Sequence, residues 1–218
     1  MDLRTLFKTL SAELIERGIE PSLRGNPPCG TESIREFERA SSLQLPRRIS
    51  DIYTGFADGF IFEWEDSQET SGLFGLPPLS QLTEDTQTWQ DTIRSFTDDP
   101  SSMDQCVAPP YREEAFRCWN RMRSWIPIWN EGNGDHFCLD ATTGEIQYYP
   151  HAWYDGFGKI ATTCGIPAGT DLDDFVVNWS RYYFTPPHHY YWGAFLKAGR
   201  ITWEPSYFGT DHVRPGLH

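Results

Sequence analysis

The order of apolar and polar positions predicts that the chain begins with three amphipathic helices. Apolar side chains recur at intervals of three and four residues over 3–17, 31–43 and 47–56, which is the spacing of one helix face. Gly18 follows the first stretch at the position of a C-terminal cap. Pro46 suits the first turn of the third helix, where a missing N–H costs nothing.

The middle of the chain alternates between short strands and helical pieces. We expect two strands joined by an acidic turn, then two separate helical pieces, a loop and a further helix. In chain order these are strands at 60–64 and 72–76, a short helix or turn around Leu82, a helical piece with Trp89, Ile93 and Phe96, a loop over 97–110 and a helix over 111–124.

The clearest strand pattern runs from Trp125 to Ile146. Asn133-Gly134-Asp135 separates two apolar runs, and Gly144 follows Leu139-Asp140. Glycine and asparagine accept positive φ, so both steps are turn signals. The stretch therefore predicts a small antiparallel meander, and it holds no arrangement that would make or break a covalent bond.

Two features close the chain. Thr170 or Asp171 is expected to cap a last helix that buries Leu172, Phe175, Val176 and Trp179. The segment after residue 185 is irregular and rich in aromatic side chains, which are poor ingredients of a disordered tail. We expect it to pack on the domain or on a partner.

Length and charge limit the classes of function. The 218 residues suffice for a real core, and the net charge is −13. Such a surface repels phosphate backbones, so direct nucleic-acid binding is not expected, whereas a basic partner would be attracted. An acidic surface that serves only solvation is an equally good interpretation of the charge.

Cysteine usage and hydropathy bear on the compartment. Five cysteines at 29, 106, 118, 138 and 164 form no close pair, so reduced and mostly buried thiols are expected. The first residues do not resemble a signal peptide, and no apolar run is long enough to span a membrane. We therefore expect a soluble cytoplasmic protein without membrane contact, and the oligomeric state is left open.

The negative charge is concentrated in one part of the chain. Residues 61–110 contain ten acidic side chains and a single basic one, Arg94. A solvated negative face and a docking surface for a basic protein explain this equally well, the latter with two tryptophans as aromatic anchors. The candidate partner-binding residues are Glu63, Trp64, Glu65, Asp66, Glu69, Glu84, Asp85, Trp89, Asp91, Asp98 and Asp99.

Candidate catalytic and metal-binding groups are few. Asp135, His136 and Asp140 lie close in sequence, but they do not follow a calcium-loop pattern, and turn formation explains them better. The adjacent His188 and His189 are more typical of a surface loop than of a metal site. No nucleophile elbow and no phosphate-binding loop occurs. We therefore expect no catalytic residues, no metal and no cofactor.

Several motifs in the same order resemble the SUKH superfamily, also described as the Smi/Knr-type domain. The resemblance covers roughly residues 31–184 and leaves the N-terminal helix and the aromatic tail outside. The residues that carry it are Leu45-Pro46 with Ile49, Tyr53, Phe56 and Gly59; Leu76-Pro77-Pro78-Leu79 with Leu82; Trp125-Ile126-Pro127-Ile128; Gly132, Gly134 and Asp135; Cys138-Leu139-Asp140 with Gly144; Tyr149-Pro150-His151; and the 171–179 helix.

The resemblance implies a single α+β domain with a central mixed or mostly antiparallel sheet and helices packed around it. The domain would span 31–184, with a helical extension at 1–30 and an aromatic-rich extension at 185–218 packed on it. Trp125, Pro127, Asp140 and Gly144 are expected to hold the sheet rather than contact a ligand.

The resemblance also implies a non-enzymatic function. Bacterial members are mostly immunity proteins that neutralise a cognate secreted polymorphic toxin, often a nuclease, and fungal relatives are scaffolds in cell-wall regulation. We therefore expect an immunity protein that binds a basic toxin through its acidic surface. The alternative is a scaffold or regulatory binding module. A hydrolase would need a pocket with converging histidine and carboxylate groups.

Overall fold

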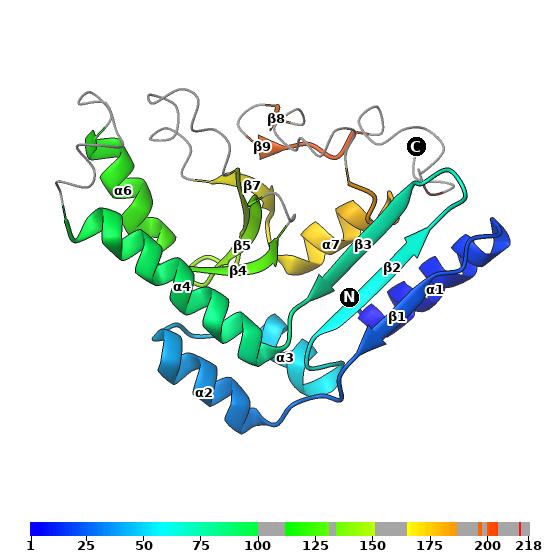
Figure 1. The fold of residues 1–218 in the computed structure, drawn as a ribbon, viewed down its shortest axis with the longest axis horizontal. Helices are drawn as coiled ribbons and strands as arrows, with labels where there is room; N and C mark the ends of the chain where they lie inside the picture. The colour runs from blue at the N-terminus through cyan, green and yellow to red at the C-terminus, as the bar shows by residue number, and fades with distance from the viewer. Residues whose placement is uncertain are drawn as a thin grey trace.

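The computed structural model describes residues 1–99, 112–130, 134–150, 165–186, 196–197, 200–204 and 214. Within them, helices pack against antiparallel sheets in one compact body (Figure 1), so the predicted α+β class is confirmed. The strands form two main sheets and a short third pairing of β8 (Leu196–Lys197) with β9 (Arg200–Ile201), where the resemblance implied one central sheet.

The first sheet contains β1 (Ser22–Gly25), β2 (Phe60–Glu65) and β3 (Ser71–Leu76) in the order β1-β2-β3. Buried and open positions alternate along β2, so Phe60, Phe62 and Trp64 point inward. Helix α1 (Leu3–Glu16) covers this inner face, with the Phe7 ring centroid 5.1 Å from that of Phe62. Leu3, Phe7, Leu10 and Leu14 of α1 therefore belong to the main hydrophobic cluster.

A glycine turn leads into β2. Gly59 has φ +79°, and a Cβ there would lie 2.5 Å from the backbone nitrogen of Pro78. Only glycine fits both the backbone angle and the close approach. Asp58 on the same turn accepts a hydrogen bond from the backbone N–H of Leu79 at 2.8 Å, which ties the turn to the start of the following helix.

The predicted meander is confirmed in the second sheet. Its strands are β4 (Trp125–Asn130), β5 (His136–Asp140), β6 (Ile146–Tyr149) and β7 (Ile166–Gly169), paired in that order. β7 and β1 were not predicted. Pro127 lies on the edge strand β4, where a residue without an N–H is tolerated.

Both faces of the second sheet are buried. Phe137 and Leu139 on β5 belong to the main hydrophobic cluster, whereas Cys138 between them belongs to a second cluster. The second cluster also contains buried side chains of the helices on that side, among them Ile93 and Trp119. The sheet is therefore covered on one side by the main core and on the other by helices.

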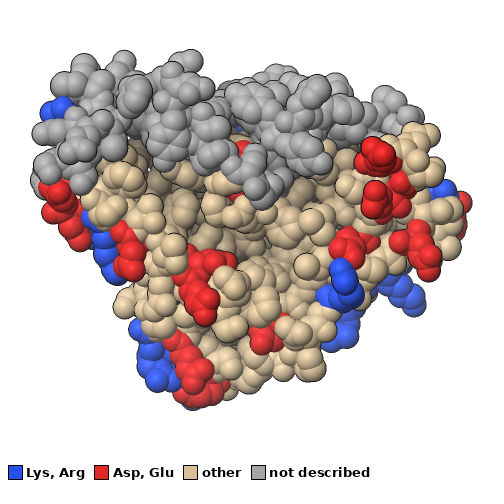
Figure 2. Space-filling model, in the orientation of Figure 1, with Lys and Arg blue, Asp and Glu red and all other residues tan. Residues whose placement is uncertain are grey.

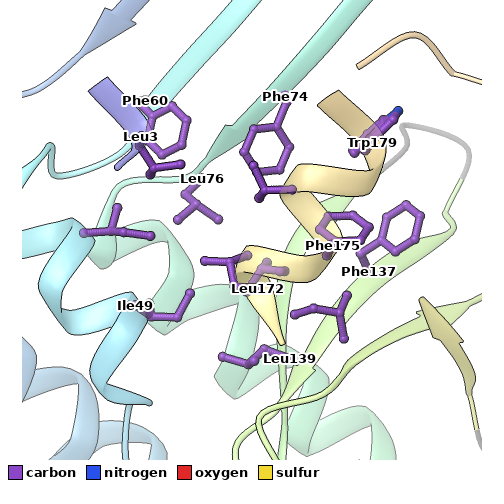
Figure 3. Close-up of a cluster of buried hydrophobic side chains, with 14 of the residues drawn as sticks. Leu3, Ile49, Phe60, Phe74, Leu76, Phe137, Leu139, Leu172, Phe175 and Trp179 are labelled. Atoms are coloured by element: carbon purple, nitrogen blue, oxygen red, sulfur yellow. The ribbon is translucent and has the colours of Figure 1, made fainter. Parts of the chain in front are cut away.

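Helix α7 (Leu172–Ser180) connects the cores of the two sheets. Its Phe175 ring lies 4.8 Å from that of Phe137 on β5, and its Trp179 ring lies 5.8 Å from that of Phe74 on β3. Figure 3 shows these side chains pointing toward one another around the helix. Asp171 caps the helix as predicted, because its carboxylate accepts the backbone N–H of Asp174 at 2.8 Å.

The two helical pieces expected around Leu82 and Trp89 form one helix, α4 (Leu79–Thr97). Polar side chains interrupt the row of buried apolar residues along this helix. The hydrophobic pattern therefore predicted two separate pieces. The Thr86 hydroxyl donates to the Leu82 carbonyl at 2.7 Å, and the Gln90 amide donates to the Ser41 carbonyl at 2.9 Å. The other helices are α2 (Thr31–Ser41), α3 (Arg47–Gly55) and α6 (Arg112–Met122).

The described residues of the C-terminal segment contact the body. The Trp203 indole N–H donates to the Ala168 carbonyl at 3.1 Å, and the Tyr182 hydroxyl donates to the Trp203 carbonyl at 2.6 Å. Arg214 donates two hydrogen bonds to Glu13, at 2.8 and 2.7 Å. The rest of the predicted extension, including Trp192, Phe195, Tyr207 and Phe208, lies outside the described residues.

Candidate partner-binding cleft

A cleft of about 870 Å³ opens between the first sheet, helix α4 and the edge of the second sheet. Figure 2 shows this face of the molecule, where the side chains around the hollow are mostly uncharged and both acidic and basic side chains lie to its sides. Most of the lining is apolar or aromatic, and a few polar groups enter from the rim. This combination is typical of binding sites.

The outer face of the first sheet forms one wall. Arg24, Ile61 and Gly75 are opposite one another in the strand register, so they share this face. Gly75 has to be glycine, because a Cβ there would lie 2.1 Å from the Phe60 carbonyl oxygen. No side chain projects into the cleft at Gly75, and the Ile61 side chain beside it is 40% exposed.

One face of α4 forms the second wall. Asp85, Thr88, Trp89 and Thr92 line the cleft and recur at helical spacing. The Trp89 ring stacks on Trp125 at 6.2 Å and meets Tyr149 edge-on at 5.1 Å. Its indole N–H donates to the Met122 carbonyl at 2.9 Å. Trp89 is thus fixed in the second hydrophobic cluster and presents its remaining surface to the cleft.

Adjacent ends of β4, β5 and β6 in the second sheet form the third wall, through Trp129, Asn130, His136 and Tyr149. His136 Nδ1 lies 2.7 Å from the Gly134 carbonyl oxygen, which can only accept, so Nδ1 donates. In the neutral ring Nε2 then accepts from the Asn130 amide at 3.2 Å. Both ring nitrogens therefore have protein partners.

Some predicted acidic residues form surface ion pairs with arginines of the same chain. Glu63 pairs with Arg24 at 2.5 Å, Asp91 pairs with Arg94 at 3.0 Å, and Asp98 pairs with Arg123. Asp66 holds the β2–β3 turn, because its carboxylate accepts the backbone N–H groups of Gln68 and Thr70. Asp99 follows Asp98 at the surface.

Other predicted acidic residues have no arginine or lysine partner within the described residues. Among the described residues, Glu65, Glu69, Glu84 and Asp85 form no ion pair. Glu65 and Glu69 lie at the β2–β3 turn, and Glu84 and Asp85 lie on α4. The structure therefore divides these acids into one group at the β2–β3 turn and one group on α4, where Asp85 lines the cleft.

The prediction that Trp64 is a surface anchor is wrong. Its side chain is 3% exposed, and its indole N–H donates to the Tyr183 carbonyl at 2.7 Å. Gly72 leaves room for this bond, because a Cβ there would lie 2.2 Å from both groups. Of the two predicted aromatic anchors, only Trp89 lines the cleft.

Residues that sequence reasoning missed form much of the cleft, notably Arg24, Ile61, Trp129, His136 and Tyr149. Ile61 carried a signal, because it lies between inward-pointing Phe60 and Phe62 and must point outward. The others had no local signal, since their shared position depends on how the two sheets and α4 come together.

Asp140 is a structural carboxylate, as the sequence suggested. It is 1% exposed, and it accepts hydrogen bonds from the Ser124 hydroxyl, the Thr142 N–H, the Trp125 indole and Arg121. Asp135 accepts a hydrogen bond from the buried Tyr148 hydroxyl. Within the described part of the chain, no three histidine, cysteine or carboxylate side chains group to hold a metal ion. His188 and His189 lie outside that part.

The cysteines differ from the expectation of reduced thiols. Cys118 is disulfide-bonded, whereas Cys29 and Cys138 are free. Burial raises the pKa of the Cys138 thiol well above its ordinary value, and burial also raises the pKa of Cys29. Both free thiols are therefore poor nucleophiles. Cys106 and Cys164 lie outside the described residues.

No protein-family model and no curated protein matches this chain. The resemblance to the SUKH superfamily consequently stays a prediction that rests on the motifs alone. Among the helices of the described residues, none is both long and apolar enough to cross a membrane.

Proposed function

We propose that this protein is an immunity protein that binds and neutralises a cognate secreted toxin without catalysing a reaction. The cleft carries the proposal, because it combines an apolar and aromatic lining with the carboxylate of Asp85, which forms no ion pair within the described residues. Protein interfaces have this organisation, with buried aromatic anchors at the centre and polar groups at the rim.

The charge pattern supports a basic partner. Glu65 and Glu69 at the β2–β3 turn and Glu84 and Asp85 on α4 form no ion pair within the described residues, and the whole chain carries a net charge of −13. Such a surface accelerates the approach of a positively charged protein and discourages acidic ones. Positive surfaces are typical of nucleases, because their substrate is a polyanion.

The test uses the toxin encoded next to the gene of this protein. Mixing the two purified proteins should give a stoichiometric complex in size-exclusion chromatography with light scattering, and the toxin should lose its activity. Reversing Glu65 and Glu69 to lysine should lower the association rate about tenfold at low salt and weaken its salt dependence. Asp66 is left unchanged, because its carboxylate holds the turn.

Glu16 and Glu20 give the matched control. Reversing both to lysine changes the net charge equally, but Glu16 lies on α1, against the face of the first sheet opposite the cleft. This variant should associate nearly as fast as the natural protein. An association rate that ignores both salt and the Glu65 and Glu69 substitutions contradicts the acidic-surface mechanism. Failure to bind the neighbouring toxin, with capture of a host protein instead, favours a scaffold.

A further inference from the structure

A carboxylate and an aromatic ring lie side by side on the α4 wall of the cleft. Asp85 and Trp89 are separated by one helical turn, which places their side chains next to each other on the same helix face. Both line the cleft. A group bound at this wall therefore meets a negative charge and an aromatic surface together.

The Asp85 charge is available to a cation from outside. Its Oδ1 accepts a hydrogen bond from the neutral Gln81 amide at 2.7 Å, and it forms no ion pair within the described residues. Arg24, on the opposite wall, is already paired with Glu63 at 2.5 Å. Among the described lining residues, the Arg24 guanidinium thus already has a carboxylate partner, whereas the Asp85 carboxylate has no cationic one.

Trp89 is held in place before any ligand arrives. Stacking on Trp125, the edge contact with Tyr149 and the hydrogen bond to the Met122 carbonyl fix its ring. The His136 ring lies beside it, with centroids 5.8 Å apart. A fixed aromatic surface loses little conformational entropy on binding, which favours its use as an anchor site.

We infer that the cleft binds an arginine side chain of the protein partner, with its guanidinium against Asp85 and the ring of Trp89. Guanidinium is planar and weakly hydrated, so it pairs with a carboxylate and stacks on an aromatic face at once, which a lysine ammonium does less well. The cleft volume of about 870 Å³ exceeds that of one side chain and takes the flanking residues as well. Ile61, which lines the cleft and is 40% exposed, suits an apolar neighbour of the arginine.

This inference deepens the proposed function and relies on it only for the nature of the partner, so its test uses no toxin. The probe is an acetylated and amidated pentapeptide, Gly-Leu-Arg-Leu-Gly, compared with versions that carry lysine or the neutral isostere citrulline. Titration of the ¹⁵N-labelled full chain, followed by NMR, should shift the Trp89 indole signal and the α4 amides near Asp85. The arginine peptide should bind about tenfold tighter than the citrulline peptide.

The neighbouring residue gives a matched variant. Asp85→Asn should remove the preference for arginine over citrulline, whereas Glu84→Gln, which removes the same charge one position earlier outside the cleft lining, should keep it. The NMR spectrum of each variant reports whether it is folded. If Asp85→Asn does not fold, the comparison of the arginine and citrulline peptides on the natural protein still decides whether the cleft prefers a guanidinium.

Three results overturn the inference: equal binding of the arginine and citrulline peptides, an unchanged preference in folded Asp85→Asn, or shifts confined to the β2–β3 turn. The immunity function is tested separately. A protein that neutralises its toxin but shows no preference for the arginine peptide has the proposed function without this anchor. A protein that binds the arginine peptide in the cleft but binds no toxin has the arginine site at Asp85 and Trp89 without the proposed function.

Discussion

Replacing Asp140 by alanine should destabilise the meander while leaving the cleft unaltered. The carboxylate is 1% exposed and accepts the Ser124 hydroxyl at 3.0 Å, the Thr142 N–H at 2.9 Å and the Trp125 indole at 3.3 Å. Arg121 also donates to it at 3.3 Å. The substitution removes the acceptor for all four donors.

The donors do not contribute equally to the cost. Trp125 is completely buried, so its indole N–H would stay unsatisfied, which costs about 1–3 kcal/mol. Ser124 and Thr142 are less buried and can turn to water, and together they add about 1 kcal/mol. The Arg121 side chain is 43% exposed, so its ion pair adds little. The expected loss is about 3 kcal/mol, or a fall in Tm of roughly 10 °C.

Urea unfolding followed by tryptophan fluorescence and by far-ultraviolet circular dichroism measures the loss. Arg121→Gln is the control, and it should cost no more than about 1 kcal/mol because it removes only the exposed partner. If Asp140→Ala costs as little as Arg121→Gln, the carboxylate does not hold the meander. If it abolishes partner binding at unchanged stability, Asp140 belongs to a binding surface and its structural role is refuted.

Two further predictions concern the Glu13–Arg214 pair and the glycine turns. The Arg214 hydrogen bond holds the pKa of Glu13 below its ordinary value, so this stabilisation is complete above the ordinary carboxyl pKa and is lost as pH falls through the lowered one. Glu13→Gln should therefore lower the urea midpoint at neutral pH by the equivalent of about 1–3 kcal/mol, and the difference should shrink in acid; a constant difference would contradict this. Gly59→Ala should lower Tm more than Gly144→Ala, because both have positive φ but only Gly59 has backbone within 3 Å of an added Cβ. Equal losses would exclude the close approach to Pro78 as the cause.

Local patterns predicted most of the individual elements. The helix at 3–17 is α1 with Gly18 at φ +78°, and the strand pattern at 125–146 is the meander with Gly144 at φ +81°. These elements depend on side-chain periodicity and turn residues, which are encoded within a few positions of each other. The two-residue periodicity of a strand also accounts for the burial of Trp64, since it points to the same inner face of β2 as Phe60 and Phe62.

Elements without a pattern of their own were missed. Ser22–Gly25 has no alternation of buried and exposed residues, and it is a strand because β2 pairs with it. Helix α4 was divided because Thr86 and Gln90 lie buried on its apolar stripe, where their hydrogen bonds satisfy them. Burial of polar groups depends on partners elsewhere in the chain, so no local window contains the signal.

The sequence by itself determined the helices other than α4, the meander and the concentration of acids over residues 61–110, because each depends on residues close together in the chain. The tertiary structure decided which of those acids is neutralised and which faces a cavity. Asp91 and Asp98 pair with arginines, whereas Asp85 lies beside Trp89 and across the cleft from Ile61. That arrangement arises where α4 and two separate sheets meet, and such packing depends on contacts between distant segments.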